Sequence, residues 1–131
     1  MKATGHKLAL IVTTWTALMR GEPTPWLPDL LDENVVWQGL LPHMVCTGRG
    51  QVLERMAKLR ATPPRITRIE AEEFGDQVAV SVAGPDLPEN EALAAGAPRS
   101  LVFSFRAQQV IHIQSFVSRD SAFRRNTAPE S

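Results

Sequence analysis

The fold is decided by residues 32–60, which read DENVVWQGLLPHMVCTGRGQVLERMAKLR. Val35-Val36-Trp37 is short and rich in β-prone side chains, so it predicts a strand. Gly39–Thr47 predicts a loop, and Gln51–Arg60 predicts a helix. The buried stripe of that helix would consist of Val52, Leu53, Met56 and Leu59. A strand, a loop and a helix in this order would give a pocket its wall, its rim and its lid.

Upstream of this stretch the apolar residues follow helical spacing. The residues that would share one face of this helix are Leu8, Ile11, Val12, Trp15, Leu18 and Met19. Gly21 predicts the end of the helix, because glycine accepts the left-handed conformation that is common at helix C-termini. Thr24 then predicts the N-cap of a second, short helix, with Pro25 in its first position.

Downstream of Pro63-Pro64 the apolar pattern changes to a period of two, which is typical of strands. The predicted strands are Arg65–Phe74, Gln77–Ala83, Arg99–Arg106 and Val110–Val117. The Pro85–Pro98 connection is long and holds few large apolar residues, so we expect it to be more mobile than the strands it joins. Helices followed by antiparallel strands predict the α+β class, with three N-terminal helices on one face of a sheet.

The composition limits the classes of function. The chain has 131 residues, of which 14 are basic and 14 acidic, so its formal net charge is zero. A neutral chain lacks the excess of positive charge on which nucleic-acid affinity depends. The single cysteine, Cys46, excludes an intramolecular disulfide, and no phosphate or dinucleotide fingerprint predicts a cofactor. No apolar run approaches the roughly 20 residues of a membrane span, so we expect a soluble, cytoplasmic protein.

The order of these elements resembles a known family. The residues that carry the resemblance are Leu31–Trp37 at the first strand, Gly48-Arg49-Gly50 before the third helix, and the closing segments Phe103–Phe105 and Val110–Ile113. Over residues 8–123 the chain resembles the SnoaL-like branch of the nuclear transport factor 2-like superfamily. The resemblance implies a cone: a strongly curved, mixed or antiparallel sheet wrapped around three N-terminal helices, with a pocket inside. We expect one such domain over residues 1–125 and a disordered tail over residues 126–131.

The catalytic residues of this superfamily are mostly missing from the sequence. The resemblance implies that isomerases of this fold use a tyrosine on the first helix, whereas this chain has no tyrosine. Their general-base aspartate aligns with Gln38, whose amide cannot accept a proton at neutral pH. Their second acid aligns near Leu101, and the acid that SnoaL-like cyclases carry on the last strand aligns with Ser115. Each difference weakens the transfer of these activities to this chain.

The residues that remain define a candidate pocket. His43, on the predicted loop, is the candidate catalytic residue, because histidine is the side chain most easily tuned to neutral pH. A solvated loop histidine is the alternative, and Gln38 could orient a substrate or merely bond to backbone or water. The predicted ligand-binding residues are Trp15, Gln38, Met56, Leu101, Phe103, Ser115 and Val117. His6, His43 and His112 have no metal-ligand spacing, so no metal site is predicted.

Two functions fit this pattern. The first is a pocket for a hydrophobic small molecule, with or without isomerase, cyclase or hydratase chemistry on that ligand. The second is a non-catalytic domain that dimerises or binds a partner, with a cone filled by its own side chains. In either case we expect a homodimer through the outer face of the sheet, which Phe116 and the row Val78, Val80 and Val82 would make apolar. An open cavity would favour the first function and a packed interior the second.

Overall fold

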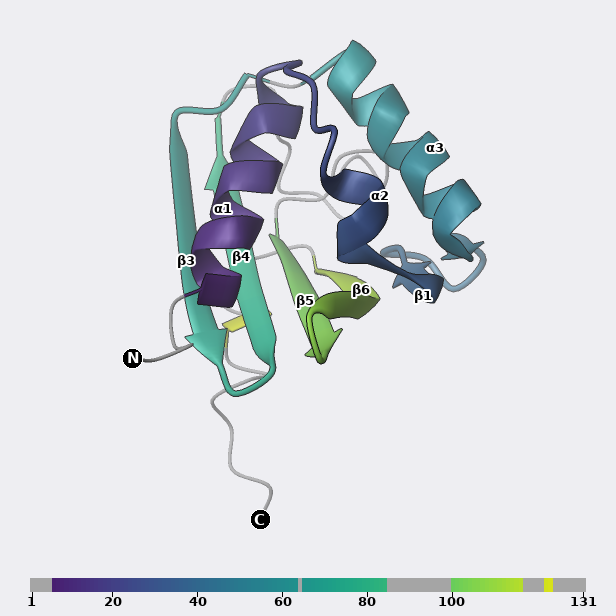
Figure 1. Cartoon of the computed structure of the whole chain (residues 1–131). Coiled ribbons are helices and arrows are strands. Elements are labelled where there is room, and N and C mark those ends of the chain that lie inside the picture. Colours follow the sequence, from purple (N-terminus) through teal and green to yellow (C-terminus); the bar gives the residue numbers. More distant parts are fainter. Residues whose placement is uncertain (1–5, 64, 85–99, 117–121, 124–131) are drawn as a thin grey trace.

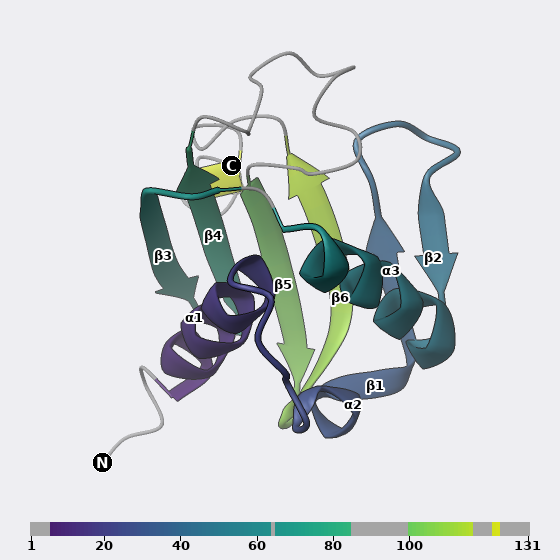
Figure 2. The ribbon, with the colours of Figure 1, turned by 90° about the horizontal axis from the view of Figure 1, so that it is seen from above.

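A computed structural model describes residues 6–63, 65–84, 100–116 and 122–123 of the chain. A six-stranded sheet carries the helices α1, α2 and α3 on one of its faces (Figure 1, Figure 2). The helices are α1 (His6–Met19), α2 (Leu27–Leu30) and α3 (Arg49–Ala61). The strands are β1 (Leu31–Gln38), β2 (Val45–Thr47), β3 (Arg68–Phe74), β4 (Gln77–Ala83), β5 (Ser100–Arg106) and β6 (Gln109–Phe116). This arrangement confirms the predicted α+β class with a curved, mixed sheet.

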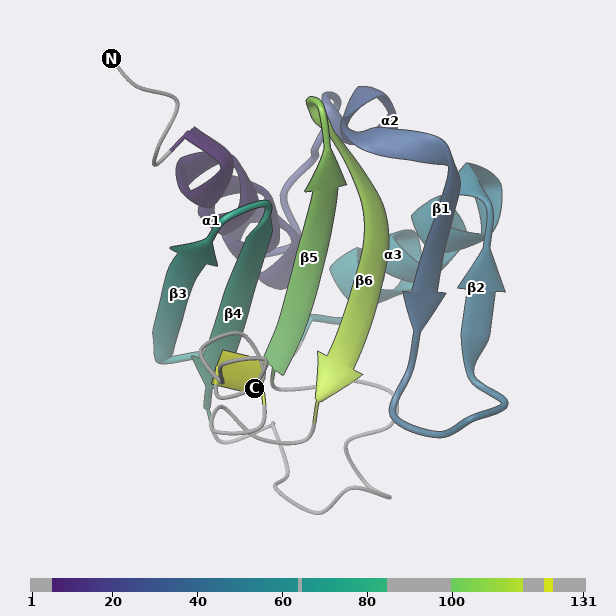
Figure 3. The same ribbon diagram turned by 90° about the horizontal axis from the view of Figure 1, so that it is seen from below.

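The sheet runs in the order β2-β1-β6-β5-β4-β3. The neighbouring strands β1 and β6 are parallel, and the other neighbouring strands are antiparallel. In this parallel pair Trp37 lies beside Ile113. Figure 3, which views the sheet from the side opposite the helices, shows β1 and β6 next to one another. The β1–β6 pairing therefore joins the helical N-terminal half of the chain to the hairpins that follow.

The main hydrophobic core lies between the helices and the inner face of the sheet. From the helices, Ile11, Trp15 and Leu18 of α1 and Val52 and Met56 of α3 are buried in it. The sheet contributes alternate residues of its strands: Val35, Trp37, Val78, Val80, Val82, Leu101, Phe103, Phe105 and Ile113. Successive side chains of a strand point to opposite faces, so the period of two in the sequence selects this one face.

The outer face of the sheet carries a second, smaller apolar cluster. Its members are Ala79, Val102, Ala122 and Phe123, with Phe74 and Phe116 packed against them. The assignment of the Val78, Val80 and Val82 row to the outer face was wrong, because these three valines are buried in the main core together with α1. The alternate residues of β4 are small and apolar as well, so the sequence pattern did not distinguish the two faces.

The first two strands differ from the sequence prediction. β1 begins at Leu31 rather than at Val35, because pairing with β6 sets its start in spite of the polar residues between them. Val45–Thr47, predicted as part of a loop, forms β2 and pairs with β1. The connection between them is closed by the Gly39 N–H, which donates to the Met44 carbonyl at 2.6 Å. With only three residues, β2 is too short to show a period of two in the sequence.

Two other boundaries also moved. The helix α2 begins at Leu27 with Trp26 as its N-cap residue, and no side chain caps it. The prediction of Thr24 as the N-cap was therefore wrong, and its hydroxyl does not cap this helix. The third strand begins at Arg68 rather than at Arg65.

Several predictions fall outside the described residues. These concern the Pro85–Pro98 connection, the ligand-binding residue Val117 and the tail over residues 126–131. The mobile connection and the disordered tail therefore stay predictions. Within the described ranges, no helix is both long and apolar enough to cross a membrane.

Candidate ligand-binding site

Three aromatic rings meet in the interior between the helices and the sheet. Trp15 on α1 meets Trp37 on β1 edge to face, with ring centroids 6.3 Å apart. Trp15 meets Phe103 on β5 in the same way at 5.8 Å. Trp37 donates its indole N–H to the Ser115 hydroxyl at 2.9 Å, and both residues are buried. The bond satisfies the indole N–H within the core, so neither group is presented to a ligand.

The charged side chain of Arg55 reaches this interior from α3. Its guanidinium carbon lies 4.7 Å from the centre of the Trp37 ring. A cation over the face of an indole is attracted by the negative charge of that face. Trp37 thus contacts Arg55 through its ring face and Ser115 through its N–H, which makes it the centre of the buried contacts on this side of the core.

Beside these rings, the described part of the interior contains a small void. This void of about 10 Å³ lies between the helices and the sheet. Its lining consists of Ile11, Thr14, Trp15, Leu27, Leu30, Leu31, Met56, Phe103 and Val110. Such a volume holds one water molecule at most. The structure therefore brings Trp15, Met56 and Phe103 together around a space too small for a ligand, and Leu101 is buried in the same core.

Gln38 and His43 lie elsewhere, Gln38 at the end of β1 and His43 on the connection between β1 and β2. The Gln38 side-chain amide donates to three backbone carbonyls of this connection at 3.1–3.4 Å, those of Gly39, Leu41 and Met44. His43 is exposed in the same connection. Ser115 is buried in the core, so the described geometry does not bring these three polar candidates to one point.

A groove of about 240 Å³ opens on the surface beside α2 and α3, and we call it the α2–α3 groove. Its lining is mostly apolar and consists of Leu18, Thr24, Leu27, Pro28, Leu53, Met56, Ala57 and Arg60. Leu27 and Met56 also line the interior void, so these two side chains separate the groove from the void. Methionine is unbranched and flexible, which makes this wall adaptable.

Thr24 gives the α2–α3 groove a polar group with no partner. The residue is 5% exposed, and its Oγ1 makes no hydrogen bond to the residues that the structure describes. The Leu27 N–H donates to the Thr24 carbonyl at 3.0 Å, which fixes the residue in the turn before α2. An unpaired buried hydroxyl costs about 1–3 kcal/mol. A polar group on a bound molecule would offset that cost.

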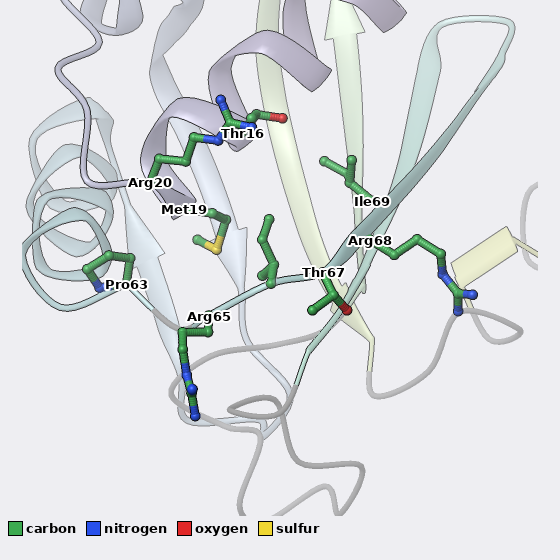
Figure 4. Close-up of a pocket in the computed structure, with 9 residues that line it drawn as sticks. Thr16, Met19, Arg20, Pro63, Arg65, Thr67, Arg68 and Ile69 are labelled. Atoms are coloured by element: carbon green, nitrogen blue, oxygen red, sulfur yellow. The ribbon is translucent and has the colours of Figure 1, made fainter.

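A second groove, of about 350 Å³, lies between α1 and the start of β3 (Figure 4). Its lining consists of Thr16, Met19, Arg20, Pro63, Arg65, Ile66, Thr67, Arg68 and Ile69. Figure 4 shows the side chains of Arg20, Arg65 and Arg68 extending in different directions. The three charges therefore do not converge on one point, and this α1–β3 groove has a less defined polar site than the α2–α3 groove.

Models of known protein families give no match to this chain, and neither do curated protein sequences. Solved structures do match. A hypothetical protein with a ketosteroid isomerase-like fold from Catenulispora acidiphila, in complex with trimethylamine, is 20% identical, with 91% of this chain and 93% of that chain covered and a TM-score of 0.56. An NTF2-like protein of unknown function from Mesorhizobium loti is 17% identical, with coverages of 90% and 96% and a TM-score of 0.59. The chain has the nuclear transport factor 2-like fold.

A third matching structure is named for an enzymatic activity. It is a candidate polyketide cyclase from Pseudomonas putida, 14% identical, with 89% of this chain and 95% of that chain covered and a TM-score of 0.56. Identities this low establish the fold and leave the function to be argued from the site.

Sequence analysis missed two groove residues of this chain. Thr24 was interpreted as a helix cap, and Arg60 belonged to no motif. The signal for Arg60 was its spacing, because Leu53, Ala57 and Arg60 follow one another at four and then three residues and so share one side of α3. Nothing in the sequence showed that α2 and Thr24 would lie against that side.

Proposed function

We propose that this chain binds a small hydrophobic molecule and that the α2–α3 groove is where the molecule makes contact. The observation that carries the proposal is a mostly apolar groove whose wall holds the buried, unpaired Thr24 hydroxyl. Apolar clefts with a few polar groups are typical small-molecule sites. The fold supports the proposal, since one protein that shares it was solved with trimethylamine and another is a candidate polyketide cyclase.

Met56 connects this groove to the ligand-binding residues predicted from the sequence. Its side chain lines both the groove and the void, and Trp15 and Phe103 line the void from the far side. A rotation of Met56 would join the two spaces and let an apolar chain reach the two rings. We infer that a ligand makes its own space by displacing Met56.

Chemistry on the ligand stays a prediction. Acid–base catalysis through His43 would need the imidazole within about 3 Å of the proton it transfers. His43 is exposed on the β1–β2 connection, and the side-chain amide of Gln38 donates its N–H groups to backbone carbonyls there. The proposal is therefore one of binding, with no reaction assigned.

We expect Ala57→Phe to weaken binding of the neutral fluorescent probe N-phenyl-1-naphthylamine about tenfold or more, a loss of roughly 1.4 kcal/mol. Ala57 is exposed and lines the α2–α3 groove, so a phenyl ring there would fill the groove without entering the core. Fluorescence titration of the full chain and the variant measures the change.

Glu54→Phe is the matched control for this experiment. Glu54 is also exposed on α3 but does not line the groove, so this variant should bind the probe as the unmodified chain does. Equal affinities of the two phenylalanine variants would place the probe elsewhere. An unmodified chain that does not bind the probe would overturn the proposal.

A second candidate function, a dimerising domain with a filled cone, is favoured by the small volume of the void between the described residues of the helices and the sheet. The occupant of the outer face would be a second copy of the chain. Val45, on the edge strand β2, is 41% exposed, and the half-buried Phe116 belongs to the outer cluster. By strand alternation Val45 lies on the face opposite Cys46, which packs against the main core, so both apolar side chains belong to the outer face.

We expect sedimentation to show a dimer at concentrations of about tens of micromolar, the range in which weak dimers begin to dissociate. Val45→Lys should shift the equilibrium toward the monomer, because it would place two like charges near the apolar contact. Glu54→Lys, on the helical side of the molecule, should leave the equilibrium unchanged. A monomer at every concentration would count against the dimer.

A further inference from the structure

We propose that the ligand of the α2–α3 groove is an amphipathic carboxylate whose charged group binds Arg60. This inference rests on the proposed function and names the chemical class of its ligand. The groove lining is apolar apart from Thr24 and Arg60. A molecule that complements this surface needs an apolar body and one polar end.

Arg60 sets the sign of the charge at that polar end. It is half-buried in the last turn of α3. None of the described residues that line the groove is acidic, so the lining itself does not neutralise this charge. A guanidinium can only donate hydrogen bonds, and its planar fork of N–H groups matches the two oxygens of a carboxylate. The groove therefore favours an anionic acceptor over an amine or an alcohol.

Thr24 supplies a second, independent observation. Its Oγ1 is buried without a partner behind the wall of the same groove, so a ligand reaches it when the side chains that cover it move. A hydroxyl can donate its O–H to a carboxylate oxygen, and hydrogen bonds to a charged group are stronger than those between neutral groups. Both polar groups of the groove therefore favour a ligand that accepts hydrogen bonds.

The dimensions of the groove indicate a short ligand. Its volume of about 240 Å³ is below the roughly 300–1,000 Å³ of pockets for drug-sized molecules. Pro28, Leu53 and Ala57 supply accessible apolar surface for a short alkyl chain, and Met56 allows that chain to extend toward the void. The α1–β3 groove is larger and richer in arginine, but its charges diverge (Figure 4).

The test compares octanoate with 1-octanol, which have the same chain length and differ in the charge of the end group. Calorimetric titration of the full chain should show that octanoate binds about tenfold more tightly or better. Arg60→Gln should remove this preference, so that the variant binds octanoate and 1-octanol about equally, while Arg60→Lys should keep part of the preference. Arg20→Gln removes an equal charge from the α1–β3 groove and should change neither affinity.

Thr24→Val tests the second contact with a readout besides binding. Because the hydroxyl is unpaired, its removal should raise the melting temperature while weakening the binding of octanoate. A lower melting temperature with unchanged octanoate binding would show that Thr24 does not contact the ligand.

The outcomes separate this inference from the function on which it rests. The carboxylate inference would be overturned if the unmodified chain bound octanoate and 1-octanol equally well, or if the Arg60→Gln variant kept the preference for octanoate. Neither result would contradict the proposal that the groove binds a small hydrophobic molecule. A chain that binds neither molecule nor the neutral probe would overturn both.

Discussion

Trp37→Ala is expected to lower the free energy of unfolding by about 3–5 kcal/mol. The Trp37 side chain is 1% exposed. It contacts Trp15 edge to face, lies beneath the Arg55 guanidinium and donates to Ser115. Truncation would leave a cavity, an unpaired hydroxyl and a charge without its aromatic surface. Domains of this kind are stable by about 5–15 kcal/mol in total, so the variant would be close to unfolding.

Urea unfolding of a small set of variants measures this loss and divides it. Trp37→Phe keeps most of the apolar packing and removes the N–H, and Ser115→Ala removes its acceptor. Combining the two changes should cost less than the sum of the single changes, because each alone leaves a polar group unpaired. A loss below about 1 kcal/mol for Trp37→Ala would mean that the indole lines an open space, and the description of a filled interior would then fail.

Gly84→Ala should destabilise the chain by about 3 kcal/mol or more, because it forces atoms into a space already occupied by backbone. A Cβ atom at Gly84 would overlap the carbonyl oxygen of Arg65 and come within 2.8 Å of the Ile66 Cα. Backbone atoms cannot rotate away as a flexible side chain can. The end of β4 and the segment that leads into β3 would therefore have to separate.

Gly50→Ala is the matched control. A Cβ atom there meets no atom within 4 Å, and the position lies inside α3. Alanine is the better helix former, so this change should raise the free energy of unfolding by about 0.5 kcal/mol. Thermal unfolding of both variants decides the comparison, and a Gly84→Ala variant as stable as the unmodified chain would show that the two segments are not in close contact.

The periodicity of the sequence predicted the elements better than it predicted their surroundings. The stripe through Ile11, Trp15 and Leu18 and the alternation along β4 are long enough to identify a helix and a strand. Alternation alone does not say which face is covered, and Ala79 is as buried as its valine neighbours. The valines were therefore assigned to the wrong face. β2 has only three residues, and its formation depends on the partner strand β1.

The candidate site was less accessible to sequence analysis. Trp15, Met56 and Phe103 were predicted to meet, because each is an apolar residue on the inner side of its element. The character of the space between them depends on how closely the rings interlock, which residue types do not specify. Thr24 shows a second limit. Its hydroxyl lacks a partner because α2 begins at Leu27, and a shift of a few residues in a helix start lies within the uncertainty of any sequence pattern.

During synthesis β1 leaves the ribosome long before the strand that it pairs with. Trp37 and Ser115, which share a hydrogen bond across the parallel pair, are 78 residues apart in the chain. Closing so long a loop costs conformational entropy before the contact stabilises anything, and folds dominated by such distant pairings form slowly. The edge of β1 that pairs with β6 stays open until Gln109–Phe116 has been made. An unpaired strand edge can pair with another chain, so the incomplete protein is exposed to aggregation until this strand is in place.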